Sequence, residues 1–308
     1  WAGEAIHRLY RRYISPDWVQ SQDDPLLWAR AEEIPDQDLW NAHTFLKRKM
    51  FAIIRERARQ DRITRATAPE QLLASGIFLD PDALVVGFAR RFATYKRANL
   101  IFRDIERLRR LVHDPYRPIQ FIFAGKAHPA DDPAKLMLQQ IYNYTRDPEF
   151  GGRIAFVEDY DMHIARYLVQ GVDVWLNTPR KPNEASGTSG MKAAFNGVIN
   201  LSVLDGWWAE AYNGRNGWAI ESGVESDDVE WQDQADAEKL YEVLEEEVVP
   251  LFYQRDRADI PRGWAAMMRE SIRTVGPQFS TRRMVKEYTE RYYVPALRDV
   301  LAMEKAET

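Results

Sequence analysis

The segment EASGTSGMKAAFNG, residues 184–197, combines small residues with a single lysine in a pattern suited to phosphate chemistry. Within it, SGTSG precedes the helix that we expect over MKAAFNG, and this would leave backbone N–H groups free to bind an anion. The spacing differs from that of the nucleotide loop GxxxxGK[ST], since Met191 precedes the lysine. Lys192, expected in the first turn of the helix, is either an ordinary surface lysine or an amine that forms an imine with an aldehyde cofactor.

A second candidate anion site is the cationic segment ARRFATYKR, residues 89–97. It places four basic residues within eight positions of a chain whose net charge is −5: Arg90, Arg91, Lys96 and Arg97. One interpretation is a solvated first turn of a helix. However, cations at a helix N-terminus oppose the helix dipole, so an anion held between them and the helix amides is the better interpretation. We therefore expect a bound phosphate here.

Short apolar runs that alternate with helical patterns precede both segments. The runs cover residues 83–89, 119–125, 153–159, 172–177 and 198–203. Strands that are apolar on both faces and alternate with helices indicate a parallel sheet covered on both sides. Ligands of such sheets bind beyond the carboxyl ends of the strands, which is where the two candidate segments fall. We predict an α/β fold with a Rossmann-like parallel sheet.

The two ends of the chain carry apolar residues at three-and-four spacing, which indicates helices. We predict a helical connector over residues 1–80, the Rossmann-like domain over 81–275 and a C-terminal helix over 276–308. Ser280 or Thr281 is the expected N-cap of that last helix.

The composition excludes several classes of function. The 308 residues are 45% hydrophobic and 29% charged, as in soluble globular proteins, and the net charge gives no general reason to bind nucleic acid or an anionic membrane. The absence of cysteine rules out disulfides, thiolate metal sites and cysteine nucleophiles, and it fits a cytoplasmic protein. The five histidines have no metal-ligand spacing, so we expect no metal site. No run approaches the length of a membrane span.

Several motifs, in order, resemble those of the α-glucan phosphorylases, which act on glycogen, starch or maltodextrin. EASGTSGMKAAFNG resembles their pyridoxal-phosphate segment and RRFATYKR their phosphate-binding segment, while FAGKAHP and EDY fall in the family's order. The sequence from about residue 83 onward is similar to the compact bacterial branch, and the match before it is weaker. The resemblance implies the second of two Rossmann-like lobes.

This resemblance implies phosphorolysis with retention, in which orthophosphate attacks a terminal α-1,4-glucosyl bond and glucose 1-phosphate leaves. Pyridoxal 5'-phosphate would be the cofactor, and its phosphate would exchange a proton with the substrate phosphate. Lys192 would hold the cofactor as a Schiff base. The residues implied around the cofactor phosphate are Arg90, Tyr160, Thr188 and Ser189.

The same resemblance assigns the substrate residues. Arg91 and Lys96 would bind the substrate phosphate, and with Lys192 they are the implied catalytic residues. The glucosyl ring would be bound by four consecutive residues, Glu184, Ala185, Ser186 and Gly187. Arg90 stands where the better-known branch has a lysine, which keeps the charge, and Ser189 and Gly190 replace a Gly-Asn pair.

The implied partner is an N-terminal lobe that the sequence lacks. The chain opens on Trp1 rather than on methionine, and we expect either a piece of a longer protein or a lobe supplied by another chain. The C-terminal helix would pack on that lobe, and we expect no competent phosphorolysis without it. A homo-oligomer is left open.

Two other functions remain. A nucleotide-sugar-dependent retaining glucosyltransferase would bind a diphosphate at the cationic segment, although SGTSGMK argues against it. A non-catalytic glucan-binding module would leave two phosphate-sized sites unexplained. Cofactor content separates both from the phosphorylase interpretation.

Overall fold

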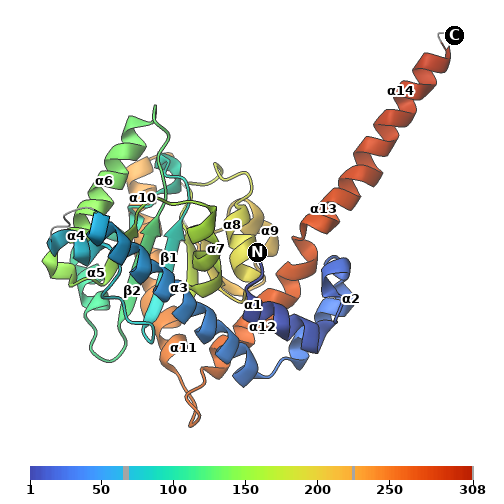
Figure 1. Cartoon of the computed structure of the whole chain (residues 1–308). Helices are drawn as coiled ribbons and strands as arrows, with labels where there is room; N and C mark the ends of the chain where they lie inside the picture. Colours follow the sequence, from blue (N-terminus) through green and yellow to red (C-terminus); the bar gives the residue numbers. More distant parts are fainter. Residues whose placement is uncertain (65–68, 224–225, 307–308) are drawn as a thin grey trace.

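Six parallel strands form one sheet flanked by helices in the computed structural model, which describes residues 1–64, 69–223 and 226–306 (Figure 1). The strands are β1 (Leu84–Ala89), β2 (Ile119–Ala124), β3 (Ile154–Val157), β4 (Val174–Asn177), β5 (Ile199–Val203) and β6 (Gly217–Ile220). Their order across the sheet is β3-β2-β1-β4-β5-β6, and every neighbouring pair is parallel. The predicted α/β fold is confirmed. The order reverses between β1 and β4, the position at which open α/β sheets bind ligands.

The helices alternate with the strands and extend to both ends of the chain. They are α1 (Glu4–Leu9), α2 (Pro25–Trp28), α3 (Asp36–Thr64), α4 (Pro69–Ala74), α5 (Ile105–Val112), α6 (Asp132–Arg146), α7 (Met162–Gly171), α8 (Thr188–Ala194), α9 (Trp207–Ala211), α10 (Val229–Val243), α11 (Val249–Tyr253), α12 (Arg262–Gln278), α13 (Thr281–Tyr288) and α14 (Val294–Ala306). The predicted N-terminal and C-terminal segments are thus helical. Residues 65–68 of the first and 307–308 of the second lie outside the described residues.

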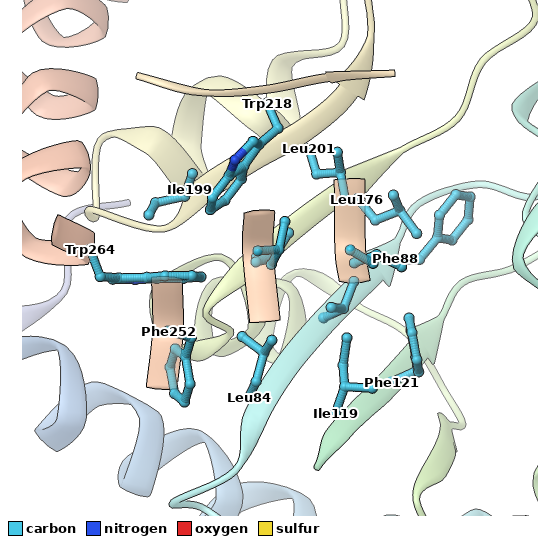
Figure 2. Packing of buried hydrophobic residues seen from close by; sticks show 14 of the residues in the cluster. Leu84, Phe88, Ile119, Phe121, Leu176, Ile199, Leu201, Trp218, Phe252 and Trp264 are labelled. Carbon is cyan, nitrogen blue, oxygen red and sulfur yellow. The ribbon is translucent and has the colours of Figure 1, made fainter. Parts of the chain in front are cut away.

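Both faces of the sheet are buried, and in β1, β2, β3 and β4 alternate side chains enter different clusters. In β1, Leu84 and Phe88 belong to the cluster covered by α5, α6, α10, α11 and α12, whereas Val85 points to the cluster formed with α3, α7 and α8. Figure 2 shows Phe252 and Trp264 packing toward the strand residues of the first cluster. This double burial explains why the strands read as continuous apolar runs.

A buried charged cluster fastens α3 to the start of the sheet. Asp173, directly before β4, lies 2.7 Å from His43 Nε2 and accepts a 2.6 Å hydrogen bond from Lys47 Nζ. The oxygen that accepts from Lys47, Oδ2, also accepts a hydrogen bond from the Val85 amide at 2.8 Å. All three side chains are almost fully buried, so the carboxylate joins one helix to two strands. The cluster lies at the amino ends of the strands, opposite the ends at which ligands bind.

The helical segment after Ser280 has no buried residue among those whose exposure is described, residues 281–303, and it projects away from the body of the molecule (Figure 1). Ser280 caps α13 by accepting a hydrogen bond from the Arg283 amide, so the first of the two predicted N-caps is correct. The exposed apolar residues of these helices include Tyr292, Tyr293 and Leu297. Among the described residues, no helix is both long enough and apolar enough to cross a membrane.

Candidate functional site

The candidate site lies where β1 and β4 end side by side. Arg90 follows β1 directly and Asn177 is the last residue of β4. The two side chains meet across the strand boundary, with Arg90 Nη1 donating to Asn177 Oδ1 at 3.0 Å. Both residues are more than nine-tenths buried. A cation is therefore held at the reversal of strand order.

Glu184 brings two of the predicted cations together. Its Oε2 accepts a 2.7 Å hydrogen bond from Arg90 Nη2 and lies 3.2 Å from Lys96 Nζ. The three side chains are at most 11% exposed. Burial lowers the pKa of Arg90, an effect that the Glu184 carboxylate opposes. The carboxylate predicted to bind sugar hydroxyls thus lies between cations predicted to bind phosphates.

Arg97 ties the exit of β1 to the exit of β4. Its Nε and Nη2 donate to the carbonyls of Thr178 and Pro179 at 2.8 and 2.9 Å, and its Nη1 pairs with Asp233 at 2.9 Å. In return, Thr178 Oγ1 donates to the Lys96 carbonyl at 3.0 Å. Arg97, part of the predicted cationic cluster, is therefore buried and links the loop after β1 to the loop after β4 through hydrogen bonds.

The prediction that the cationic segment begins a helix is wrong. A 3-10 turn, Thr94–Lys96, follows β1, and Arg97 ends it with a left-handed φ of 44°. The first α-helix after β1 is α5, which begins only at Ile105. The helix-dipole argument therefore does not apply, and carboxylates, Glu184 among them, compensate the cations instead. Arg91 is exposed and has no carboxylate partner within the described parts of the chain.

The helix that carries Lys192 begins earlier than predicted. It starts at Thr188 instead of Met191, so Lys192 is its fifth residue and lies in the second turn instead of the first. The reason is Gly187, whose φ of 95° turns the chain into the helix and which offers no side-chain cap. The Gly190 amide donates to the Gly187 carbonyl at 3.2 Å, whereas the Thr188 and Ser189 amides, without a partner among the described residues, are open to an oxygen ligand.

Lys192 faces an aromatic ring instead of a carboxylate. Its Nζ lies 4.3 Å from the centre of the Trp1 ring, and the described residues give it no ion pair. Hydrogen bonds to the Trp1 carbonyl from Gln170 Nε2 at 2.9 Å and Asn196 Nδ2 at 3.2 Å hold this segment in place. Burial lowers the pKa of Lys192. An amine that gives up its proton readily and lies against an aromatic surface is suited to imine chemistry.

Two of the small residues before Lys192 are explained by protein packing. A Cβ on Gly190 would lie 2.6 Å from Asn200 Oδ1 and 2.8 Å from the Trp207 ring, so only glycine lets α8 approach that closely. Ser189 Oγ accepts a 3.3 Å hydrogen bond from Trp175 Nε1 of β4. The small residues therefore serve the contact between α8 and the sheet in addition to any ligand.

The remaining predicted residues surround the same strand ends. Tyr160 donates a 3.4 Å hydrogen bond to the Ala89 carbonyl, next to Arg90, and burial raises its pKa. Two hydrogen bonds connect the predicted sugar segment to the residues after β5. The Glu184 amide donates to Asp205 Oδ2 at 2.8 Å. The Trp207 amide donates to the Ser186 carbonyl, also at 2.8 Å. Within the part of the chain that the structure describes, the Thr188 side chain makes no hydrogen bond, and Ala185 has no polar side-chain atom to make one.

The predicted site therefore consists of two groups. One contains Arg90, Lys96, Glu184 and Tyr160 at the ends of β1 and β4, and the other contains Lys192 with Trp1. Within the described ranges, no hydrogen bond or ion pair joins Lys192 to the first group.

Two buried donor atoms at the ends of β1 and β4, one in Arg90 and one in Asn177, have no partner among the described residues. Arg90 Nε and Asn177 Nδ2 are inaccessible to solvent and make no hydrogen bond in the described structure. Buried donors without acceptors are unfavourable, and an anion with several oxygens would satisfy them. The site thus fits a phosphate group. No set of three or more potential metal-ligating residues occurs among the described residues.

Sequence reasoning missed Trp1 and Asn177. Trp1 is 191 positions from Lys192, and no local pattern connects them. Asn177 ends a predicted strand, and its position at a strand exit could have drawn attention to it.

The sequence is similar to those of known carbohydrate phosphorylases. The carbohydrate phosphorylase family model matches residues 43–249. The glycogen phosphorylase of Aquifex aeolicus is 50% identical over 97% of this chain and 43% of its own length. The maltodextrin phosphorylase of Thermococcus litoralis is 47% identical over 99% of this chain and 36% of its own length. The glycogen phosphorylase of Mycobacterium tuberculosis is 43% identical over 92% of this chain and 34% of its own length.

The chain therefore spans less than half the length of these curated relatives. The family match covers the sheet, the cationic segment and the lysine helix, the same parts that form the candidate site. The chain belongs to the carbohydrate phosphorylase family.

Proposed function

We propose that this chain is the cofactor-binding and phosphate-binding part of an α-glucan phosphorylase that depends on pyridoxal 5'-phosphate. Such an enzyme transfers a terminal glucosyl residue to orthophosphate and releases glucose 1-phosphate with retained configuration. The observation that carries the proposal is Lys192, a half-buried amine of lowered pKa with an aromatic ring in place of a counter-ion. The nucleotide-sugar alternative gives this lysine no role.

Several residues could hold the cofactor. Lys192 would bind it covalently through its amine, with the Trp1 ring close by. Arg90, Tyr160, Thr188 and the Ser189 amide would hold its phosphate. Bound pyridoxal phosphate would supply a phosphate group that exchanges a proton with the substrate phosphate. Arg90 and the open amides of α8 would fix that group in position and keep it ionised.

Arg91 and Lys96 would bind orthophosphate. Arg91 is exposed and free of carboxylate partners in the described structure, so it can approach an incoming anion and bind it through two nitrogens. Lys96 is paired with Glu184 at 3.2 Å. For a sugar to bind residues 184–187, Glu184 would accept hydrogen bonds from its hydroxyls and release Lys96 to the phosphate. Ligand binding would thus rearrange existing ion pairs.

The enzyme would need a second lobe. The helices over residues 281–306 carry exposed apolar side chains, among them Tyr292, Tyr293 and Leu297, which we propose are covered by that lobe. The relatives are more than twice as long as this chain, which leaves room for such a lobe. We further propose that the protein acts in the cytoplasm and that residues 1–80 connect the two lobes.

An assay for glucose 1-phosphate tests the proposal. The chain is incubated with maltoheptaose, orthophosphate and pyridoxal phosphate, with and without the N-terminal portion of one of the relatives named above as a separate polypeptide. We expect glucose 1-phosphate only in the complete mixture, and none when Lys192→Ala replaces the wild-type chain. If the complete mixture binds glucan and cofactor but yields no glucose 1-phosphate, the proposal is wrong.

A further inference from the structure

Asn177 lies beside Arg90 with its amide in a defined orientation. Asn177 Oδ1 accepts the 3.0 Å hydrogen bond from Arg90 Nη1, and a guanidinium nitrogen can only donate. The oxygen must therefore face Arg90, which turns Nδ2 away from it. The amide group cannot be flipped without placing two donors against each other.

Nδ2 of Asn177 is left without an acceptor. It is buried and makes no hydrogen bond among the described residues, and Nε of the bonded Arg90 side chain has the same property. Asn177 is 4% exposed and Arg90 8% exposed, so water reaches neither side chain freely. Two unpaired donors at the neighbouring ends of β1 and β4 point to an acceptor supplied by a ligand, since buried polar groups are nearly always paired.

The charges around the pair favour an anionic acceptor. Glu184 is the one carboxylate that pairs with Arg90 and Lys96 in the described structure, so these two cations keep an excess of positive charge. A neutral acceptor would satisfy the donors but would leave this excess positive charge. A phosphate offers several oxygens and negative charge together.

We propose that Asn177 is a phosphate-binding residue that donates from Nδ2 to a phosphate oxygen while its Oδ1 fixes the orientation of Arg90. The inference rests on the proposed function and extends it to a residue that the sequence motifs do not include. The phosphate belongs either to pyridoxal phosphate or to orthophosphate. Both ligands carry the same chemical group, and the experiment below separates them.

Binding measurements on three variants test this role. Asn177→Ala removes the donor and the Arg90 acceptor, and Asn177→Asp keeps the acceptor but replaces the donor with a negative charge. Asn216→Asp is the matched control, because Asn216 is equally buried but donates to Ala211 and Thr274, away from Arg90. Each chain is titrated with pyridoxal phosphate, with pyridoxal, and with orthophosphate in the presence of pyridoxal.

If Asn177 binds the cofactor phosphate, pyridoxal phosphate binds about 10- to 100-fold more weakly to Asn177→Ala and more weakly still to Asn177→Asp. Pyridoxal, which lacks the phosphate, binds all chains alike. If Asn177 binds orthophosphate, the loss appears only in the orthophosphate titration. Unchanged affinity for both phosphates in both Asn177 variants, within twofold, overturns the inference.

A crystal structure of the wild-type chain with pyridoxal phosphate and orthophosphate covers the case in which the variants do not fold. We expect Asn177 Nδ2 within about 3.2 Å of a phosphate oxygen. Phosphate bound elsewhere, with no oxygen within hydrogen-bonding distance of Nδ2, overturns the inference but leaves the proposed function intact. A wild-type chain that binds neither pyridoxal phosphate nor orthophosphate contradicts both.

Discussion

Glu184 Oε2 lies 2.7 Å from Arg90 Nη2, so a carboxylate from the predicted sugar segment forms an ion pair with a cation from the predicted phosphate segment. The same oxygen is 3.2 Å from Lys96 Nζ. The ion pairs keep two buried cations compensated when no ligand is bound. They also make Glu184 a competitor for any phosphate that approaches these cations.

Glu184→Gln should strengthen phosphate binding and weaken the fold. Removing the carboxylate frees Lys96 for orthophosphate, and we expect about tenfold tighter binding by calorimetry, equal to about 1.4 kcal/mol. Without phosphate, two buried cations lack a counter-ion, so the free energy of unfolding should fall by about 3 kcal/mol in urea titrations. Glu230→Gln, which removes an exposed partner of Arg103, should change neither quantity by more than about 0.5 kcal/mol. Weaker phosphate binding by Glu184→Gln would contradict this competition.

Asp173→Asn should be strongly destabilising. Asp173 is the only carboxylate that pairs with buried Lys47 in the described structure, and removing one partner of a buried ion pair costs about 3–5 kcal/mol. Urea denaturation measures the loss. Asp82→Asn, which breaks an exposed pair with Arg48, should cost less than about 0.5 kcal/mol. A loss below about 1 kcal/mol for Asp173→Asn would show that the cluster does not hold α3 on the sheet.

Gly190→Ala should destabilise the chain by about 1–3 kcal/mol through overpacking. The new Cβ would meet Asn200 Oδ1 at 2.6 Å and the Trp207 ring at 2.8 Å, neither of which can move freely inside the core. Gly263→Ala is the control, because this exposed helical glycine would meet only the end of the Leu251 side chain. That change should be neutral or slightly stabilising. Equal unfolding free energies for the two variants would exclude the packing role of Gly190.

The reaction of Lys192 with pyridoxal phosphate should depend on pH in a defined direction. Only the neutral amine attacks an aldehyde, and burial lowers the pKa of Lys192, so more of it is neutral at any given pH. The initial rate of imine formation, followed by absorbance, should therefore rise with pH and reach its midpoint below the ordinary lysine value of about 10.4. This phase should vanish in Lys192→Arg. A midpoint at or above about 10.4 would mean that the amine is not perturbed.

Much of the fold could be predicted because its strands are buried on both faces. Five of the six strands appear as apolar runs, although the run 153–159 is three residues longer than β3. The strand β6, with the sequence GWAI, is short and begins with glycine, so no run revealed it. Helix starts were less predictable, because the start of α8 depends on the backbone conformation of Gly187.

The site was predictable only as a set of strand exits. The motifs predicted Arg90 and Glu184 together near the carboxyl ends of strands, and the two side chains are paired in the structure, whereas Lys192 lies on α8 against Trp1. They could not show that Arg90 pairs with Asn177, because that contact exists only once β1 and β4 are neighbours. Nor could they show that Arg97 is buried and links two loops, since the sequence of a basic segment does not distinguish a buried arginine from an exposed one.

Borohydride reduction followed by peptide mass mapping tests the central claim most directly. The chain is prepared with pyridoxal phosphate, reduced and digested, with Lys192→Arg as the control. We predict a pyridoxyl group on the peptide that contains Lys192 and none on the corresponding peptide of the variant. A folded wild-type chain that carries no adduct at Lys192, even with the N-terminal portion of a relative added, would contradict the assignment of this lysine as the cofactor site.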